Sequence, residues 1–199
     1  MGLDLRGVRI LPGMLDRAEQ VRLVERLRDV CAAAPLFRPE TARGRAMSVR
    51  TTSAGAVGWV SDRRGYRYEP RHPSGVPWPP MPRELLALWA AVCPDAALPD
   101  TCLVNFYDEG ARMGLHQDRD EIRFDQPVVS ISLGDDALFR VGNVERGGRT
   151  ESIWLRSGDV AILEGPSRLA HHGVDRTRFG SSDLLAASGR VNVTMRVAR

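Results

Sequence analysis

This sequence of 199 residues has few cysteines, no long apolar run and only a small excess of positive over negative charge. The three cysteines are Cys31, Cys93 and Cys102, and no two of them form a CxxC pair. An odd number without such a pair argues against a disulfide framework and against a cysteine-based zinc site. We therefore expect these cysteines to be small buried hydrophobic residues.

No apolar stretch reaches the length of a transmembrane helix, and the first residues do not resemble a signal peptide. We expect a cytoplasmic protein that does not associate with membranes. The formal net charge of +3 is a mild basic bias, which is compatible with a phosphate-bearing partner but is shared by many proteins that bind no nucleic acid. With 43% hydrophobic residues and no repeat or linker, the chain is predicted to form a single domain over residues 1–199.

Two helices are predicted in the first half of the chain. Residues 16–34 carry an apolar stripe near helical spacing, with Asp16 and Glu19 placed as a capping box and Pro35 at the end. A second helix is predicted over residues 83–93. The six prolines within 69–82 exclude regular helix and central strand there, so that segment is expected to be a rigid loop.

From about residue 101 the pattern changes to short β-branched runs separated by glycine and aspartate turns. Such alternation is typical of an antiparallel sandwich or barrel, which here follows an N-terminal part that contains the helices. The predicted strands are 101–107, 127–133, 137–141, 151–155, 159–163 and 190–197.

A metal site is indicated by His116 and Asp118, which would project from the same face if they lie on a strand. The adjacent pair His171 and His172 can supply a third ligand. Two histidines and one carboxylate form the facial triad of non-haem Fe(II) oxygenases, which leaves coordination positions open for a cosubstrate and O₂.

The segment Arg190-Val191-Asn192-Val193-Thr194-Met195-Arg196 alternates polar and apolar residues, as a strand with two different faces does. The simplest explanation is a half-exposed strand with a polar outer face. However, Arg190 and Arg196 on one face also suit a dicarboxylate, because arginine binds carboxylates in a fixed bidentate geometry.

Eight motifs, taken together and in order, resemble the AlkB dioxygenases over roughly residues 46–197. They are Gly58-Trp59-x-x-x-Arg63-x-Gly65-Tyr66-x-Tyr68, Pro77-Trp78-Pro79-x-Met81-Pro82, Asn105-x-Tyr107, His116-x-Asp118, Ser130-Ile131-Ser132-Leu133-Gly134, Gly158-Asp159-Val160, Ser167-Arg168-Leu169-x-x-His172-Gly173 and Arg190-x-Asn192-x-Thr194-x-Arg196. The resemblance implies an α+β fold with a double-stranded β-helix (jelly-roll) core at about 101–197, N-terminal helices and a nucleotide-recognition lid at about 46–82.

The resemblance also implies roles for individual residues. The ligands of Fe(II) would be His116, Asp118 and His172, since His172 precedes the glycine as the family's ligand does. The cosubstrate 2-oxoglutarate would be bound by a set of five residues, namely Arg190 and Arg196 at its two ends and Asn105, Tyr107 and Asn192 through hydrogen bonds. The nucleotide would be contacted by Trp59, Tyr66, Asp120 and Arg146.

The activity implied by the resemblance is oxidative demethylation of N-alkylated bases such as 1-methyladenine and 3-methylcytosine, using O₂ and 2-oxoglutarate and releasing formaldehyde, succinate and CO₂. The expected partner of a monomeric enzyme is alkylated DNA, single-stranded or with the base flipped out, and RNA is a second candidate. The sequence departs from the bacterial archetype at Phe106, Val191 and His171, which leaves the lesion preference open but removes no ligand.

Three alternatives compete with this interpretation. The same chemistry could act on RNA or on a protein side chain, although the lid aromatics interleaved with Arg50, Arg63, Arg64 and Arg67 favour a stacked base beside phosphates. A non-catalytic nucleic-acid-binding module would have no need of an intact triad. A zinc hydrolase uses the same ligand types but gives no account of the Arg190 and Arg196 face.

Overall fold

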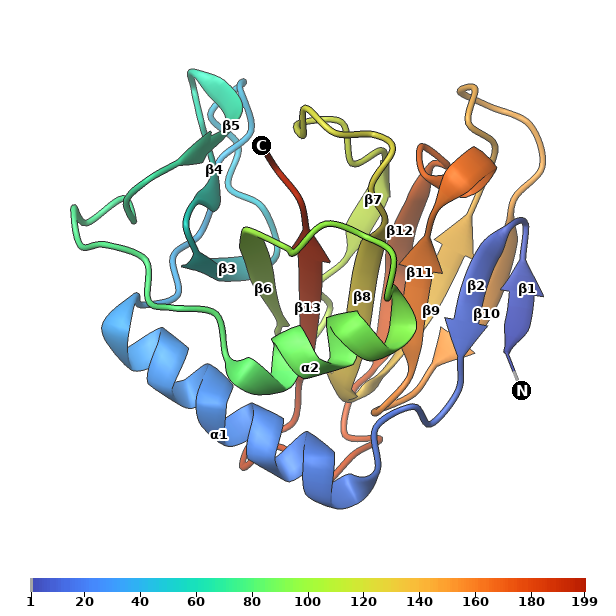
Figure 1. Ribbon diagram of the computed structural model, residues 1–199, viewed down its shortest axis with the longest axis horizontal. Helices are drawn as coiled ribbons and strands as arrows, with labels where there is room; N and C mark the ends of the chain where they lie inside the picture. The colour runs from blue at the N-terminus through green and yellow to red at the C-terminus, as the bar shows by residue number, and fades with distance from the viewer. Residues whose placement is uncertain (1) are drawn as a thin grey trace.

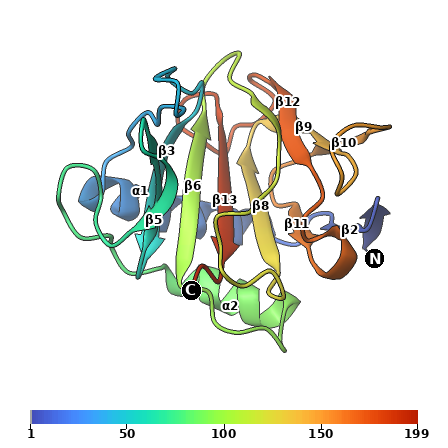
Figure 2. The ribbon, with the colours of Figure 1, turned by 90° about the horizontal axis from the view of Figure 1, so that it is seen from above.

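The computed structural model describes residues 2–199, in which two β-sheets face each other and two helices cover the outer face of the larger sheet (Figure 1). The larger sheet has seven strands in the order β1-β2-β11-β8-β13-β6-β3, and the smaller has four in the order β10-β9-β12-β7. Strands β4 and β5 form a separate hairpin. The view from above shows β6, β13 and β8 side by side at the centre (Figure 2).

The helices are α1 (Arg17–Ala33) and α2 (Arg83–Val92), and a short 3-10 helix spans Gly165–Ser167. The strands are β1 (Leu3–Leu5), β2 (Val8–Leu11), β3 (Arg50–Gly55), β4 (Gly58–Asp62), β5 (Gly65–Glu69), β6 (Thr101–Tyr107), β7 (Met113–His116), β8 (Val128–Gly134), β9 (Asp136–Val141), β10 (Glu151–Leu155), β11 (Val160–Leu163), β12 (His172–Arg178) and β13 (Arg190–Arg196).

Helix α1 begins with the predicted capping box. The Asp16 carboxylate accepts a hydrogen bond from the Glu19 backbone N–H at 2.8 Å, and the Glu19 carboxylate accepts one from the Asp16 N–H at 2.8 Å. These two bonds satisfy backbone donors that the first helical turn leaves without partners. The helix ends at Ala33, two residues before Pro35, so both predicted ends are confirmed to within a residue.

Strand β13 shows why the polar and apolar faces of the larger sheet differ. Val193 and Met195 are fully buried on the side of the helices, in one cluster with Leu85 and Trp89 of α2. The alternate residues of β13 are polar and point to the space between the two sheets. The polar face is therefore an inner face and not the solvent-exposed one that the simplest explanation of the alternation assumed.

The predicted strands from residue 101 onward are all present, with ends displaced by one residue in most cases. Strands β1 to β5, β7 and β12 were not predicted, because they are short or rich in polar and charged residues. The assumption that His116 and Asp118 share a strand is wrong. His116 is the last residue of β7, and Asp118 lies in the irregular segment that follows.

The β4–β5 hairpin is held by the proline-rich segment that follows it. That segment contains no helix and no strand, as predicted. The Trp78 indole is buried and donates a hydrogen bond to the Glu69 carbonyl at 2.9 Å, which fixes the end of β5. Gly58, at the start of β4, lies directly against the Trp78 ring, and a Cβ atom placed there would be 2.2 Å from it.

Cys93 and Cys102 are buried and Cys31 is half-buried, and all three are free thiols. None of the helices within residues 2–199 combines the length and apolar character that crossing a membrane requires.

We predict that Gly58→Ala lowers the thermal midpoint by several degrees. The added methyl group would overlap the buried Trp78 ring and the Ser53 side chain, and overpacking of this kind costs about 1–3 kcal/mol. Differential scanning calorimetry of the metal-free protein measures the effect. Gly114→Ala in β7 is the matched control, because no atom lies within 4 Å of its added Cβ, and an equal drop in both variants would contradict the packing argument.

Candidate active site

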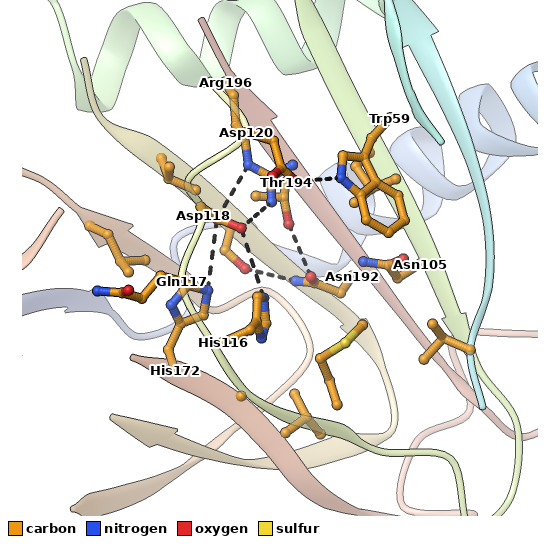
Figure 3. A pocket seen from close by; sticks show the side chains of 18 of the residues that line it. Trp59, Asn105, His116, Gln117, Asp118, Asp120, His172, Asn192, Thr194 and Arg196 are labelled. Atoms are coloured by element: carbon orange, nitrogen blue, oxygen red, sulfur yellow. Dashed lines mark hydrogen bonds and ion pairs between the residues drawn. The ribbon is translucent and has the colours of Figure 1, made fainter. Parts of the chain in front are cut away.

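Three side chains from separate segments converge between the two sheets (Figure 3). His116 comes from the end of β7, Asp118 from the segment after it, and His172 from the start of β12, which pairs with His116 across the smaller sheet. Their ligand atoms all lie within 4.8 Å of one another. This arrangement of two imidazoles and one carboxylate fits a single metal ion of the Fe(II) type.

Hydrogen bonds orient both imidazole rings toward the same point. Nδ1 of His116 lies 3.0 Å from the Gly114 carbonyl, and Nδ1 of His172 lies 3.0 Å from the Ala170 carbonyl. Because a carbonyl only accepts hydrogen bonds, each Nδ1 carries a proton, and Nε2 is the ring atom left to bind a metal. Both Nε2 atoms lie 3.8 Å from an oxygen of Asp118.

The surroundings hold these groups in the protonation states that bind a metal. Burial alone would raise the pKa of Asp118, but the Arg196 guanidinium and the two imidazoles hold it well below its usual range. Burial and the neighbouring His116 lower the pKa of His172 to about 4. The site thus offers a carboxylate and a neutral imidazole at neutral pH, so metal binding displaces no proton from either.

The adjacent histidine is directed elsewhere. His171 is half-buried, its Nδ1 lies 3.0 Å from the Asn143 carbonyl, and it does not line the cavity that contains the triad. Gly173 permits the close approach of β12 to β7, since a Cβ there would lie 2.5 Å from the Met113 carbonyl oxygen. Of the two sequence candidates, the geometry therefore selects His172.

Arg190 is a buried cation without a matching anion. It is 1% exposed, and its Nη2 donates to the Ser132 hydroxyl at 3.0 Å. Its Nε and Nη1 atoms have no hydrogen-bond partner among the described residues. Burial lowers the pKa of Arg190, and the guanidinium lies 5.0 Å from the centre of the Tyr107 ring. A buried guanidinium with two unused donors is suited to an external carboxylate.

Arg196, at the other end of β13, is already paired with acids. Its Nη2 and Nε atoms donate to the two Asp118 oxygens at 2.9 and 3.3 Å, and its Nε lies 3.2 Å from Glu121. Its Nη1 atom has no partner among the described residues. Although Arg190 and Arg196 are six residues apart, both line the same cavity, which leaves one free donor edge at each end of the strand.

This cavity has a volume of about 180 Å³ and also contains the triad. The predicted cosubstrate residues line it from adjacent strands, namely Asn105 and Tyr107 on β6 and Asn192 on β13. The Asn192 amide donates to the Ser130 hydroxyl and the Ile131 carbonyl at 2.8 and 3.0 Å, which fixes its orientation. The cavity fits 2-oxoglutarate and Fe(II) together, because it combines hydrogen-bonding side chains, two free guanidinium edges and the triad.

Two of the predicted nucleotide contacts, Trp59 and Tyr66, belong to the β4–β5 hairpin at the mouth of the cavity. Their rings stack with centroids 5.6 Å apart. The Trp59 indole donates a hydrogen bond of 2.8 Å to Asp120 (Figure 3). Asp120, which sequence reasoning assigned to a base amino group, therefore already has a donor, and burial raises its pKa.

The fourth predicted nucleotide contact, Arg146, lies exposed in the loop between β9 and β10 and does not line the cavity. The positive charge available on the predicted lid, at about 46–82, is also smaller than expected. Arg50 pairs with Asp108, and Arg67 pairs with Asp62 and Glu69, so these two guanidinium groups are neutralised within the protein.

Sequence reasoning assigned no role to three residues that surround the site. Arg168 donates to the Asp118 carbonyl at 3.0 Å and pairs with the buried Glu121. Gln117 bonds the carbonyls of Val144 and Leu169, which joins the triad segment to the two neighbouring loops. No local signal in the sequence marks Glu121 or Gln117. By contrast, the alternating Ser130 and Ser132, which bond Asn192 and Arg190, were visible as a motif.

Comparisons with known proteins agree with this geometry. Residues 7–196 match the model of the 2OG-Fe(II) oxygenase superfamily. The chain is 53% identical to the alpha-ketoglutarate-dependent dioxygenase AlkB homolog of Caulobacter vibrioides, over 97% of this chain and 88% of that one. It is 39% identical to the alpha-ketoglutarate-dependent dioxygenase AlkB of Escherichia coli, over 91% and 85% of the two chains.

Similarity extends to proteins with ALKBH1 names. The solved structure of OsALKBH1 superposes with a TM-score of 0.83 and 30% identity, covering 98% of this chain and 99% of that one. A DNA N(6)-methyladenine demethylase of Arabidopsis thaliana, ALKBH1C, is 42% identical over 50% of this chain and 24% of its own length.

We predict that His116→Ala, Asp118→Ala and His172→Ala each reduce metal affinity by at least about tenfold and abolish turnover, because a three-ligand site has no spare donor. Titration calorimetry with Mn²⁺ measures the affinity independently of activity. His171→Ala is the matched control, since its ring faces the Asn143 carbonyl. Normal metal binding in His172→Ala together with loss in His171→Ala would show that the other histidine is the ligand.

Proposed function

Because the chain belongs to the AlkB family of Fe(II)- and 2-oxoglutarate-dependent dioxygenases, we propose that it repairs N-alkylated nucleic-acid bases by oxidative demethylation. The observation that carries the proposal is the shared cavity. One space of about 180 Å³ is lined by a metal triad, by two arginines with unused donors and by an aromatic hairpin. Each of these parts serves a different component of the reaction, and all three line the same cavity.

Bound Fe(II) and 2-oxoglutarate supply the oxidising power, since decarboxylation of 2-oxoglutarate to succinate and CO₂ accompanies the insertion of one oxygen atom of O₂ into an N-methyl C–H bond. The N–C bond of the hydroxymethyl product then breaks as its hydroxyl proton is lost, which releases formaldehyde and restores the unmethylated base. In this proposal the chain holds the reactants. His116, Asp118 and His172 hold the metal, and Arg190 and Arg196 bind the cosubstrate carboxylates.

The substrate base must leave its stack, because an N-methyl carbon inside a duplex cannot reach a metal between two sheets. Trp59 is proposed to stack on one face of the extruded base, with the His116 ring on the other, and Tyr66 supports Trp59 from behind. Stacking on an aromatic side chain contributes about 1–3 kcal/mol per base. Asp120 would accept a hydrogen bond from the exocyclic amino group of adenine or cytosine in exchange for the one it accepts from Trp59.

We further propose that residues 1–199 act as one catalytic domain in which the β4–β5 hairpin serves as a lid. The proposed partner is alkylated DNA, as a single strand or with the base flipped out, and RNA is the second candidate. The demethylase and nucleic acid dioxygenase names of ALKBH1C and human ALKBH1 support a nucleic-acid substrate. Action as a monomer in the cytoplasm completes the proposal, and the three free thiols are compatible with it.

We predict that Arg190→Ala weakens 2-oxoglutarate binding by about 2–5 kcal/mol while leaving oligonucleotide affinity within a factor of about two. The reason is that Arg190 is buried with two free donors, and that it contacts Ser132 and Tyr107, which lie on β8 and β6 and not on the hairpin. Calorimetric titration of Mn²⁺-loaded protein measures both affinities. Arg176→Ala, an exposed residue on β12, is the control, and an unchanged 2-oxoglutarate affinity in Arg190→Ala would refute the assignment.

We predict that cationic 1-methyladenine and 3-methylcytosine are demethylated faster than neutral 1-methylguanine and 3-methylthymine, because Asp120 favours a cationic base with an exocyclic amino group. Formaldehyde release from single-stranded and duplex DNA and from RNA oligonucleotides, each carrying one lesion, measures the rates. Asp120→Asn is expected to reduce the difference in rate between the cationic and the neutral lesions. Equal rates on all four lesions would contradict the proposed base pocket. Absence of formaldehyde release from every lesion would contradict the proposed substrate class.

A further inference from the structure

Glu121 is a buried carboxylate that belongs neither to the metal triad nor to the predicted cosubstrate residues. Its side chain is only 2% exposed, although it lies in the irregular segment between β7 and β8. Three donors surround it. Oε1 accepts from the Tyr68 hydroxyl at 2.6 Å and lies 3.2 Å from Arg196 Nε, while Oε2 accepts from Arg168 at 3.2 Å. A charge buried this deeply is retained only where its partners are fixed.

The two arginines connect Glu121 directly to the metal ligand. Arg196 bonds the Asp118 carboxylate, and Arg168 bonds the Asp118 backbone carbonyl at 3.0 Å. The four residues form a cluster of two buried cations and two buried anions, in which each group has partners of opposite charge. Displacement of Glu121 would therefore disturb both the position of Asp118 and the guanidinium that faces the cosubstrate cavity.

The third partner, Tyr68, belongs to the β4–β5 hairpin. Tyr68 on β5 is paired with Trp59 on β4, and residues paired in this way across two strands point to the same face. Their polar hydrogens reach neighbouring carboxylates, since Tyr68 donates to Glu121 and Trp59 donates to Asp120. Burial raises the pKa of Tyr68, so its hydroxyl stays protonated and remains a donor at all working pH values.

From this geometry we propose that Glu121 is a positioning residue that fastens the β4–β5 hairpin to the Asp118–Arg196 pair through the Tyr68 hydroxyl. The two hairpin bonds have different roles. The Trp59–Asp120 bond must open when a base amino group takes Asp120, which rests on the function proposed above. The Tyr68–Glu121 bond involves no group assigned to the substrate. It therefore holds the hairpin at a fixed distance from the triad while the Trp59–Asp120 bond opens and closes.

The test compares Tyr68→Phe with Tyr66→Phe, which removes the hydroxyl of a half-exposed tyrosine on the same strand. Hydrogen–deuterium exchange is followed in the peptides covering residues 58–69, on the full chain with and without Mn²⁺ and 2-oxoglutarate. Loss of a hydrogen bond to a buried charged group is expected to speed exchange there by about tenfold in Tyr68→Phe. Tyr66→Phe is expected to match the wild type. Exchange in Tyr68→Phe equal to the wild type would overturn the proposal.

A double-mutant cycle with Glu121→Gln shows whether the effect passes through Glu121. A neutral acceptor bonds about half as strongly as a carboxylate, so Tyr68→Phe should speed exchange only about threefold when it is combined with Glu121→Gln. The same factor with and without Glu121→Gln would mean that Tyr68 acts by another contact. Thermal midpoints identify any variant that is simply unfolded.

A kinetic measurement separates positioning from general damage. Tyr68→Phe should raise KM for a methylated oligonucleotide while metal affinity stays unchanged, because the triad and its ion pair remain intact. A lower kcat with unchanged KM would contradict the proposed role. Exchange is measured without turnover, so the positioning role is decided even if the chain demethylates none of the tested lesions.

Discussion

The bidentate ion pair between Asp118 and Arg196 is the contact on which the site depends. It joins the irregular segment after β7 to the end of β13, which are 78 residues apart in the sequence. Without it, only the two imidazoles would oppose the effect of burial, which raises the pKa of Asp118. The pair therefore keeps the metal ligand ionised and at the same time places a guanidinium next to the metal.

The opposite end of β13 shows the complementary situation. Arg190 is buried without an acid, which is unfavourable in the free protein and becomes favourable when a carboxylate enters the cavity. Strand β13 thus carries Arg196, whose charge is balanced by acids of the protein, and Arg190, whose charge would be balanced by a bound carboxylate. This asymmetry gives a dicarboxylate a defined orientation, since the two ends of the cavity offer different numbers of free donors.

Much of this arrangement could be predicted from residue patterns. The alternation along β13, the capping box of α1 and the spacing of His116 and Asp118 are local signals, and the strand, the helix and the triad are present. The choice between His171 and His172 came from the family resemblance and is supported by the hydrogen bonds of their rings.

Other features depend on partners distant in the sequence, and no local pattern encodes them. Arg50 and Arg67 looked available for phosphates because their acids, Asp108 and Asp62, become neighbours only in the fold. No role could be assigned to Glu121 from the sequence, because the Tyr68 hydroxyl that it binds becomes its neighbour only when the hairpin folds. Asp118 lies beyond the strand because the Arg196 ion pair and the bond from Arg168 to its carbonyl hold it there, which strand periodicity does not describe.

The most direct test of the β13 site is to compare 2-oxoglutarate with 2-oxobutanoate, which keeps the metal-chelating 2-oxo acid but lacks the distal carboxylate. Both are titrated calorimetrically into the Mn²⁺-loaded protein. We predict that 2-oxoglutarate binds at least about a hundredfold more tightly, because only it can satisfy the free donors of Arg190. Equal affinities would contradict the claim that β13 holds a dicarboxylate between its two arginines.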